Sequence, residues 1–167
     1  MVAIAYVKLS STPTVWNLTL CNVNDEDTTW INFIDRFPLL EKLIIDGCSM
    51  MEYLHVSQQN LTNLVLYDCF VTREVRINSP KLKSLEYKGG FTFFEGIEAL
   101  QELEFVELYL DPLKFRDYWY SWIRNLLESC AHSKHLSLIC GIEELAELVS
   151  SSLPFYVALE HLLAISS

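Results

Sequence analysis

The chain has 167 residues, a formal net charge of −10 and a hydrophobic content of 51%. This hydrophobic content excludes a disordered chain and is typical of one packed domain or of a stretch of a repeat array. The negative charge disfavours binding to nucleic acid or to an anionic membrane surface, because both are themselves negatively charged. No segment approaches the roughly 18 consecutive apolar residues of a membrane-spanning helix. From the charge and from these segment lengths, neither nucleic acid nor a membrane is expected as a partner.

The cysteines and the N-terminal residues bear on the cellular compartment. Five cysteines are present, an odd number without the paired spacing of a disulfide scaffold. This pattern favours a reducing compartment, either cytoplasmic or nuclear. Val2 to Val7 are apolar but lack the basic flank and the cleavage site of a signal peptide. We expect this short segment to be a strand or a helix fragment.

Two elements are expected before residue 40. Residues 15–23 read V-x-x-L-x-L-x-x-V, and the two leucines separated by one residue predict a strand. A helix is expected next, because apolar side chains recur at a spacing of about 3.6 residues from Trp30 to Phe37. The acidic residues 25–27 suit the N-terminus of this helix.

From residue 40 the sequence repeats. A pattern of the form L-x-x-L-x-L starts at Leu40, Leu61, Leu82 and Leu103, with isoleucine, valine or tyrosine at some later positions. Each copy therefore begins 21 residues after the one before it. This step lies inside the roughly 20–29-residue range of leucine-rich repeats, and the pattern is their signature. The sequence predicts consecutive turns of a leucine-rich-repeat solenoid.

The spacing within each copy predicts how the turns stack. The last two apolar positions of a copy lie two residues apart, so both point to one face of a strand and the residues between them point to the other. Stacked turns would form a parallel sheet with Leu43, Leu64 and Leu85 side by side in its interior. Cys48 and Cys69 would follow as small buried side chains whose thiols stay protonated and inert.

The connections between copies are predicted to differ in kind. Residues 53–56 and 74–77 alternate apolar and polar side chains and lie 21 residues apart, which predicts short strands on the convex side. The pair Gly89-Gly90 is expected at a repeat turn, where glycine relieves a constraint on the backbone, and a phosphate cradle is the alternative.

A helix is expected after Pro112. Aromatic and aliphatic side chains recur at helical spacing from Phe115 to Leu127, which predicts an amphipathic helix. Trp119 and Trp122 of this helix are expected to pack in the core, and a cofactor-binding aromatic box is the alternative.

The C-terminal region continues the pattern more loosely. Paired leucines at 136–138 and 159–162 predict two further strands, and residues 142–149 predict a helix between them. The expected fold class is α/β, a leucine-rich-repeat solenoid with a parallel sheet on its concave face and mixed short strands and helices on its convex face. Residues 1–167 are expected to form one domain of about seven turns. We expect truncation at both ends, because neither end resembles the polar cap of a solenoid.

Two segments carry a resemblance to a known family. Residues 37–48, FPLLEKLIIDGC, and residues 79–89, SPKLKSLEYKG, resemble plant F-box/leucine-rich-repeat proteins of the FBD-associated kind. The resemblance covers most of the chain from about Val15 onward. It implies the substrate-recognition repeats of a cullin-based ubiquitin ligase, in which an N-terminal F-box docks a Skp adaptor. Residues 1–14 are too few for an F-box and no FBD segment follows the repeats, so a Skp adaptor is expected only as a partner of a longer chain.

No catalytic signature is found in the sequence. Phosphate-binding glycine loops, the zinc-protease helix motif and the serine-hydrolase elbow do not occur, so neither enzymatic activity nor a cofactor is expected. The best candidates for metal ligands are Cys130, His132, His135 and Cys140. Their spacing, Cys-x-His-x2-His-x4-Cys, matches no standard zinc pattern, and no metal is expected.

The residues between the ladder leucines define a candidate binding surface on the concave face. Several are apolar or aromatic where polar side chains would be ordinary, and contiguous exposed apolar area marks interaction sites. The alternative is that loops or missing segments cover them. The residues expected to bind a partner are Lys42, Ile44, Asp46, Asn63, Val65, Tyr67, Glu86, Lys88, Phe105, Glu107 and Tyr109.

These observations favour a protein-binding recognition module, because concave solenoid faces are habitual binding surfaces. A small-molecule co-receptor is an alternative that would require a deep pocket with converging polar groups. A free-standing interaction scaffold is another. An enzyme would require a catalytic role for Cys130 or His132.

Overall fold

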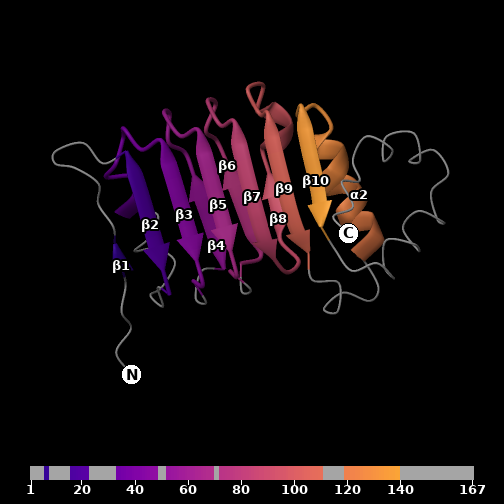
Figure 1. The fold of residues 1–167 in the computed structure, drawn as a ribbon, viewed down its shortest axis with the longest axis horizontal. Coiled ribbons are helices and arrows are strands. Elements are labelled where there is room, and N and C mark those ends of the chain that lie inside the picture. The colour runs from indigo at the N-terminus through magenta and orange to yellow at the C-terminus, as the bar shows by residue number, and fades with distance from the viewer. Residues whose placement is uncertain are drawn as a thin grey trace.

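The computed structural model describes residues 6–7, 16–22, 33–48, 52–69, 72–110 and 119–139. From β3 (Lys42–Asp46) to β9 (Phe105–Leu110) the chain passes back and forth between two sheets of mostly parallel strands. Figure 1 shows the larger sheet in front, the smaller sheet behind it and helix α2 (Trp119–Cys130) beside the C-terminal end of the stack. The described residues therefore form a solenoid-like coil of parallel strands with few helices.

The larger sheet has seven strands in the order β1-β2-β3-β5-β7-β9-β10. Its neighbouring strands are parallel except for β1 and β2, which are antiparallel. Part of the apolar segment at the N-terminus is thus a strand. The bounds are β1 Tyr6–Val7, β2 Asn17–Cys21, β3 Lys42–Asp46, β5 Asn63–Tyr67, β7 Ser84–Gly89, β9 Phe105–Leu110 and β10 His135–Ile139.

The register of this sheet aligns the leucine ladder. Leu43, Leu64 and Leu85 are direct partners on successive strands, and all three are fully buried. The prediction from the 21-residue step is confirmed here, because a slip of one residue would have turned these leucines to the opposite face. The two interior columns are Leu18, Leu43, Leu64, Leu85, Val106, Leu136 and Leu20, Ile45, Leu66, Tyr87, Leu108, Leu138.

The smaller sheet consists of the parallel strands β4 (Tyr53–Val56), β6 (Glu74–Ile77) and β8 (Phe93–Glu95). The strands predicted at 53–56 and 74–77 are confirmed with those bounds. Strand β8 was not predicted, because it starts 19 residues after its partner Glu74 and so falls outside the 21-residue step. Alternate side chains of β4 and β6 are buried and close the core from the side opposite the ladder.

A left-handed residue follows three strands of the larger sheet. Asn22, Gly47 and Asp68 have φ values of 52°, 65° and 52°. Glycine, asparagine and aspartate are the residues that adopt this conformation most readily. Each backbone N–H donates to a carbonyl of the next turn at 2.7 to 2.9 Å: Asn22 to Asp46, Gly47 to Tyr67 and Asp68 to Lys88.

The third copy of the repeat has Tyr87 in the ladder, and Gly89 makes room for it. The buried tyrosine donates its O–H to the Gly90 carbonyl at 2.6 Å and lies 2.8 Å from the Thr92 hydroxyl. A Cβ on Gly89 would lie 2.7 Å from the tyrosine oxygen. The prediction that Gly89 relieves a turn constraint is wrong: it belongs to β7, and the described glycines with positive φ are Gly47 and Gly96.

Helix α2 (Trp119–Cys130) corresponds to the helix expected from Phe115 to Leu127, of which residues 115–118 lie outside the described part. Its buried face includes Trp122, whose Nε1–H donates to the Thr92 carbonyl at 2.8 Å. Trp122 therefore packs in the core, as predicted. The other buried side chains of this face are Ile123, Leu126, Leu127 and Cys130.

Other expected elements are described only in part or not at all. Phe33 and Ile34 are helical and belong to the helix expected to end near Phe37, whereas residues 23–32 are not described. A short 3-10 helix, η1 (Ile97–Ala99), precedes β9. The helix expected at 142–149 and the strand expected at 159–162 lie outside the described residues, so the count of about seven turns stays a prediction.

Candidate binding surface

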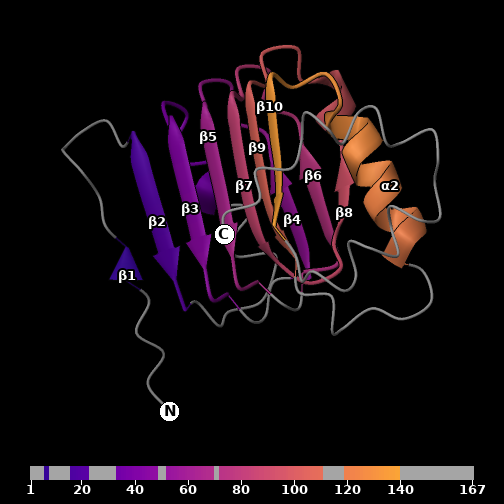
Figure 2. The same cartoon turned by 45° about the vertical axis from the view of Figure 1, so that its right-hand side comes forward.

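The side chains that alternate with the ladder form the open face of the larger sheet, the face turned away from the smaller sheet (Figure 2). The register brings together on this face every residue that was predicted to bind a partner. It also adds residues of β2 and β10. The three columns of the open face are Asn17, Lys42, Asn63, Ser84, Phe105, His135; Thr19, Ile44, Val65, Glu86, Glu107, Ser137; and Cys21, Asp46, Tyr67, Lys88, Tyr109, Ile139.

Apolar side chains on the open face differ in their exposure to solvent. Phe105 is 50% exposed and Ile139 is 43% exposed. Ile44, Tyr67 and Tyr109 are half-buried. These side chains give the face a discontinuous apolar stripe that a partner could cover.

Val65 is buried, at 5% exposure, and its prediction as an exposed contact residue is wrong. Its direct partners across the sheet are Ile44 and Glu86. Tyr67, two residues along the same face, donates its O–H to Glu86 Oε2 at 2.6 Å. This bond runs diagonally between the two strands, because the direct partner of Glu86 is Val65 and that of Tyr67 is Lys88. Alternation predicts which face a side chain occupies, but not how far its neighbours cover it.

Two tyrosine–glutamate pairs lie next to each other on the open face. Tyr67 bonds to Glu86, and the Tyr109 O–H donates to Glu107 Oε1 at 2.8 Å. Glu86 and Glu107 are themselves direct partners on β7 and β9. The hydrogen bond to a carboxylate, followed by burial, raises the pKa of each tyrosine above its usual value. Both phenols therefore remain protonated donors at neutral pH.

The remaining charged residues of the open face differ in whether they form an ion pair. Lys88 Nζ lies 3.5 Å from Asp68 Oδ2. In the described part of the chain, the side chains of Lys42 and Asp46 form no ion pair, although both were predicted to bind a partner. Asn63 accepts a hydrogen bond from the Thr62 hydroxyl at 2.8 Å through its side-chain oxygen.

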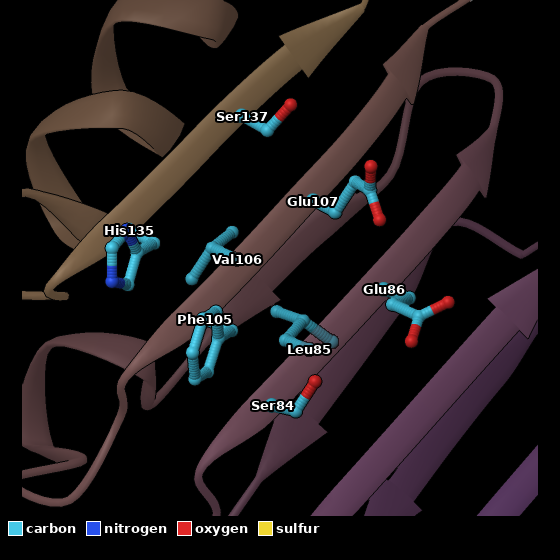
Figure 3. A pocket seen from close by; sticks show the side chains of 8 residues that line it. All are labelled: Ser84, Leu85, Glu86, Phe105, Val106, Glu107, His135 and Ser137. Carbon is cyan, nitrogen blue, oxygen red and sulfur yellow. The ribbon is translucent and has the colours of Figure 1, made fainter. Parts of the chain in front are cut away.

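A pocket of about 270 Å³ opens on the face where β7, β9 and β10 lie side by side. Figure 3 shows the rings of Phe105 and His135 at one end of it and the carboxylates of Glu86 and Glu107 at the other. The two rings are stacked, with centroids 4.8 Å apart and planes inclined by 10°. The lining residues are Ser84, Leu85, Glu86, Phe105, Val106, Glu107, His135 and Ser137.

His135 and Ser137 were not among the residues predicted to bind a partner. His135 is the direct partner of Phe105, although 30 residues separate them in the chain, because α2 lies in this connection. The available signal was the leucine pair Leu136 and Leu138, which predicted the strand. Extending the alternation to that strand would have placed both residues on the open face.

The candidate metal ligands do not converge in the described residues. Cys130 is fully buried at the end of α2, and a ring nitrogen of His132 lies 2.9 Å from the Leu100 carbonyl oxygen. His135 instead stacks on Phe105 at the open face. Cys140 lies outside the described part of the chain. No group of three His, Cys, Asp or Glu side chains in the described residues could hold a metal ion.

The cysteines that follow the ladder are buried, as predicted. Cys48 and Cys69 are 1% and 3% exposed, and their thiols lie 4.0 Å and 3.8 Å from the carbonyls of Leu20 and Ile45 in the preceding turn. Burial raises the pKa of Cys69 to about 12, and that of Cys130 to about 12. Cys69 and Cys130 are therefore protonated at neutral pH and unsuited to nucleophilic attack.

Comparison of the chain with family models, with curated proteins and with solved structures found no match. Among the described residues, no helix has both the length and the apolar character needed to cross a membrane.

Proposed function

We propose that the chain is a non-catalytic recognition module that binds a protein partner on its open face. The observation that carries this proposal is the gathering of exposed Phe105 and Ile139 with half-buried tyrosines on a regular sheet. Aromatic side chains on a rigid surface are typical binding hot spots, because they bury a large area and lose little conformational freedom on binding.

The proposed repeat class and the proposed family rest on the sequence. The pattern L-x-x-L-x-L at a 21-residue step supports leucine-rich repeats, and the segments 37–48 and 79–89 support a likeness to plant F-box/leucine-rich-repeat proteins. On that reading the module recruits a substrate to a cullin-based ubiquitin ligase in the cytoplasm or nucleus. A Skp adaptor would bind only through an F-box in a longer chain.

The size of the pocket favours a protein partner over a small-molecule ligand. Pockets for drug-sized ligands usually enclose about 300–1,000 Å³ and bury most of the ligand. The pocket between β7 and β10 measures about 270 Å³ and lies on an open sheet. It suits a single side chain of a larger partner better than a whole small molecule.

Replacement of two aromatic residues of the open face by alanine tests this proposal. We expect the double variant Phe105→Ala/Tyr109→Ala to bind the partner at least about tenfold more weakly, because both side chains lose their contact area. Proteins retained by the immobilised chain identify the partner, and titration calorimetry with the purified partner measures the affinity.

The matched control is Tyr53→Ala/Phe93→Ala, which removes two exposed aromatic residues from the smaller sheet. The control should bind as the unmodified chain does. Equal losses of affinity in both double variants, or no loss of affinity in the open-face variant, would contradict binding at the open face. Circular dichroism spectra of both variants verify that the sheets remain folded.

A further inference from the structure

Glu86 and Glu107 are neighbouring carboxylates, and no Lys or Arg in the described part of the chain forms an ion pair with either. They face each other on adjacent strands, which are about 4.8 Å apart in a sheet. Like charges directly opposite each other destabilise a sheet. The tyrosines each donate one hydrogen bond to them but are neutral, so they leave both negative charges in place. Both glutamates are half-buried, which reduces the screening of these charges by water.

Several other carboxylates in the described residues form an ion pair with Lys or Arg. Glu104 pairs with Lys134 at 2.8 Å, and Glu95 pairs with Arg76 at 2.7 Å. Lys88, two residues from Glu86 on the same face, is held by Asp68. No described Lys or Arg forms an ion pair with Glu86 or Glu107.

The pocket beside these carboxylates has the shape and chemistry for one cationic side chain. The 50% exposed ring of Phe105, stacked on His135, presents an aromatic surface to it. A guanidinium group stacks on aromatic rings and donates planar pairs of hydrogen bonds to carboxylates, whereas an ammonium group is a compact point charge. The arrangement of rings opposite carboxylates therefore matches arginine better than lysine (Figure 3).

We propose that this pocket binds an arginine side chain from a basic segment of the protein partner. The proposal rests on recognition through the open face and names the chemistry of what is recognised. The guanidinium group lies between Phe105 and the two glutamates and neutralises charge that no Lys or Arg of the described residues compensates. The pocket then sets the register of the partner, while Ile139 and Tyr109 contact its apolar side chains.

Short peptides test the pocket even while the partner is unidentified. The probes are three end-blocked hexapeptides in which glycine alternates with arginine, lysine or glutamate. Binding to the full chain is followed by titration calorimetry and by the shifts of backbone amide resonances. We expect the arginine peptide to bind most tightly, the lysine peptide more weakly and the glutamate peptide not at all. The shifted amides should belong to β7, β9 and β10.

The decisive variant is Glu86→Gln/Glu107→Gln, which keeps the shape and the tyrosine bonds and removes the charges. We expect it to weaken binding of the arginine peptide at least about tenfold, as loss of a charged partner usually does. The control Glu98→Gln/Glu128→Gln removes the same charge from exposed sites on η1 and α2. It should bind within about twofold of the unmodified chain if the attraction is local.

The outcomes separate this proposal from the broader one. Equal losses in the two variants would mean attraction to the overall charge of −10 and would overturn the arginine pocket. So would an arginine peptide that binds no better than lysine, or that shifts amides elsewhere. If the protein partner requires Phe105 and Tyr109 but is insensitive to Glu86→Gln/Glu107→Gln, recognition by the open face stands and the pocket proposal fails.

Discussion

Replacement of Leu64 by alanine is expected to lower the free energy of unfolding by about 2–5 kcal/mol. Leu64 is fully buried between Leu43 and Leu85 in the centre of the ladder. Its removal leaves a cavity as well as the lost transfer free energy of the side chain. Both neighbouring strands are held by their own hydrogen bonds, so the stack has little freedom to collapse into the space.

Urea denaturation of both proteins measures this change. The control is Asn63→Ala, one residue earlier on the same strand, whose side chain points to the open face. We expect the control to change the free energy of unfolding by no more than about 0.5 kcal/mol. Similar values for the two variants would contradict the ladder, because residues 63 and 64 would then not face opposite sides.

Gly96→Ala is expected to destabilise the chain by about 2–5 kcal/mol, through backbone strain and a steric clash together. Gly96 has a φ of 93°, a conformation that side chains other than glycine rarely adopt. A Cβ at this position would lie 2.2 Å from the carbonyl oxygen of Ile77. That oxygen belongs to the backbone at the end of β6, so relief of the clash must move a strand of the smaller sheet.

Thermal and urea unfolding of Gly96→Ala test this prediction. Asn22→Gly is the opposite change at a position of positive φ, since it removes a side chain where φ is 52°. Its effect should stay within about 1 kcal/mol of the unmodified chain. A Gly96→Ala protein as stable as Asn22→Gly would show that β6 and the turn at Gly96 do not approach each other as described.

The sheet register could be predicted from the sequence because side chains alternate along a strand with a period of two. A constant 21-residue step predicts Leu43, Leu64 and Leu85 as direct partners, and a slip of one residue would turn the leucine of one strand to the opposite face. The same step predicted β4 and β6. These elements depend on local alternation and on a repeat length, both of which are visible in the sequence.

Strand β8 could not be predicted by the same reasoning. In the third copy a tyrosine replaces the ladder leucine, and its hydroxyl must be satisfied in the core. Gly90 and Thr92 supply those polar contacts, and Gly89 supplies the space. In this same copy β8 starts two residues earlier than the repeat length predicts.

The open face was predicted in outline, but its details depend on contacts across strands. Val65 is buried, and Tyr67 bonds to Glu86 diagonally across the strands; both depend on side-chain conformation. The stack of Phe105 on His135 joins residues separated by a helix, so no fixed repeat length points to it. Sequence alternation therefore predicts which side chains share the face, whereas their exposure and pairing require the structure.

The most direct test of binding at the open face is lysine acylation. The chain is labelled with and without its captured partner, and mass spectrometry measures the extent of labelling at each lysine. Lys42 and Lys88 lie on that face, and exposed Lys81 lies in the turn before β7. We expect the bound partner to slow labelling of Lys42 and Lys88 and to leave labelling of Lys81 unchanged. Unchanged labelling of Lys42 and Lys88 in a saturated complex would contradict it.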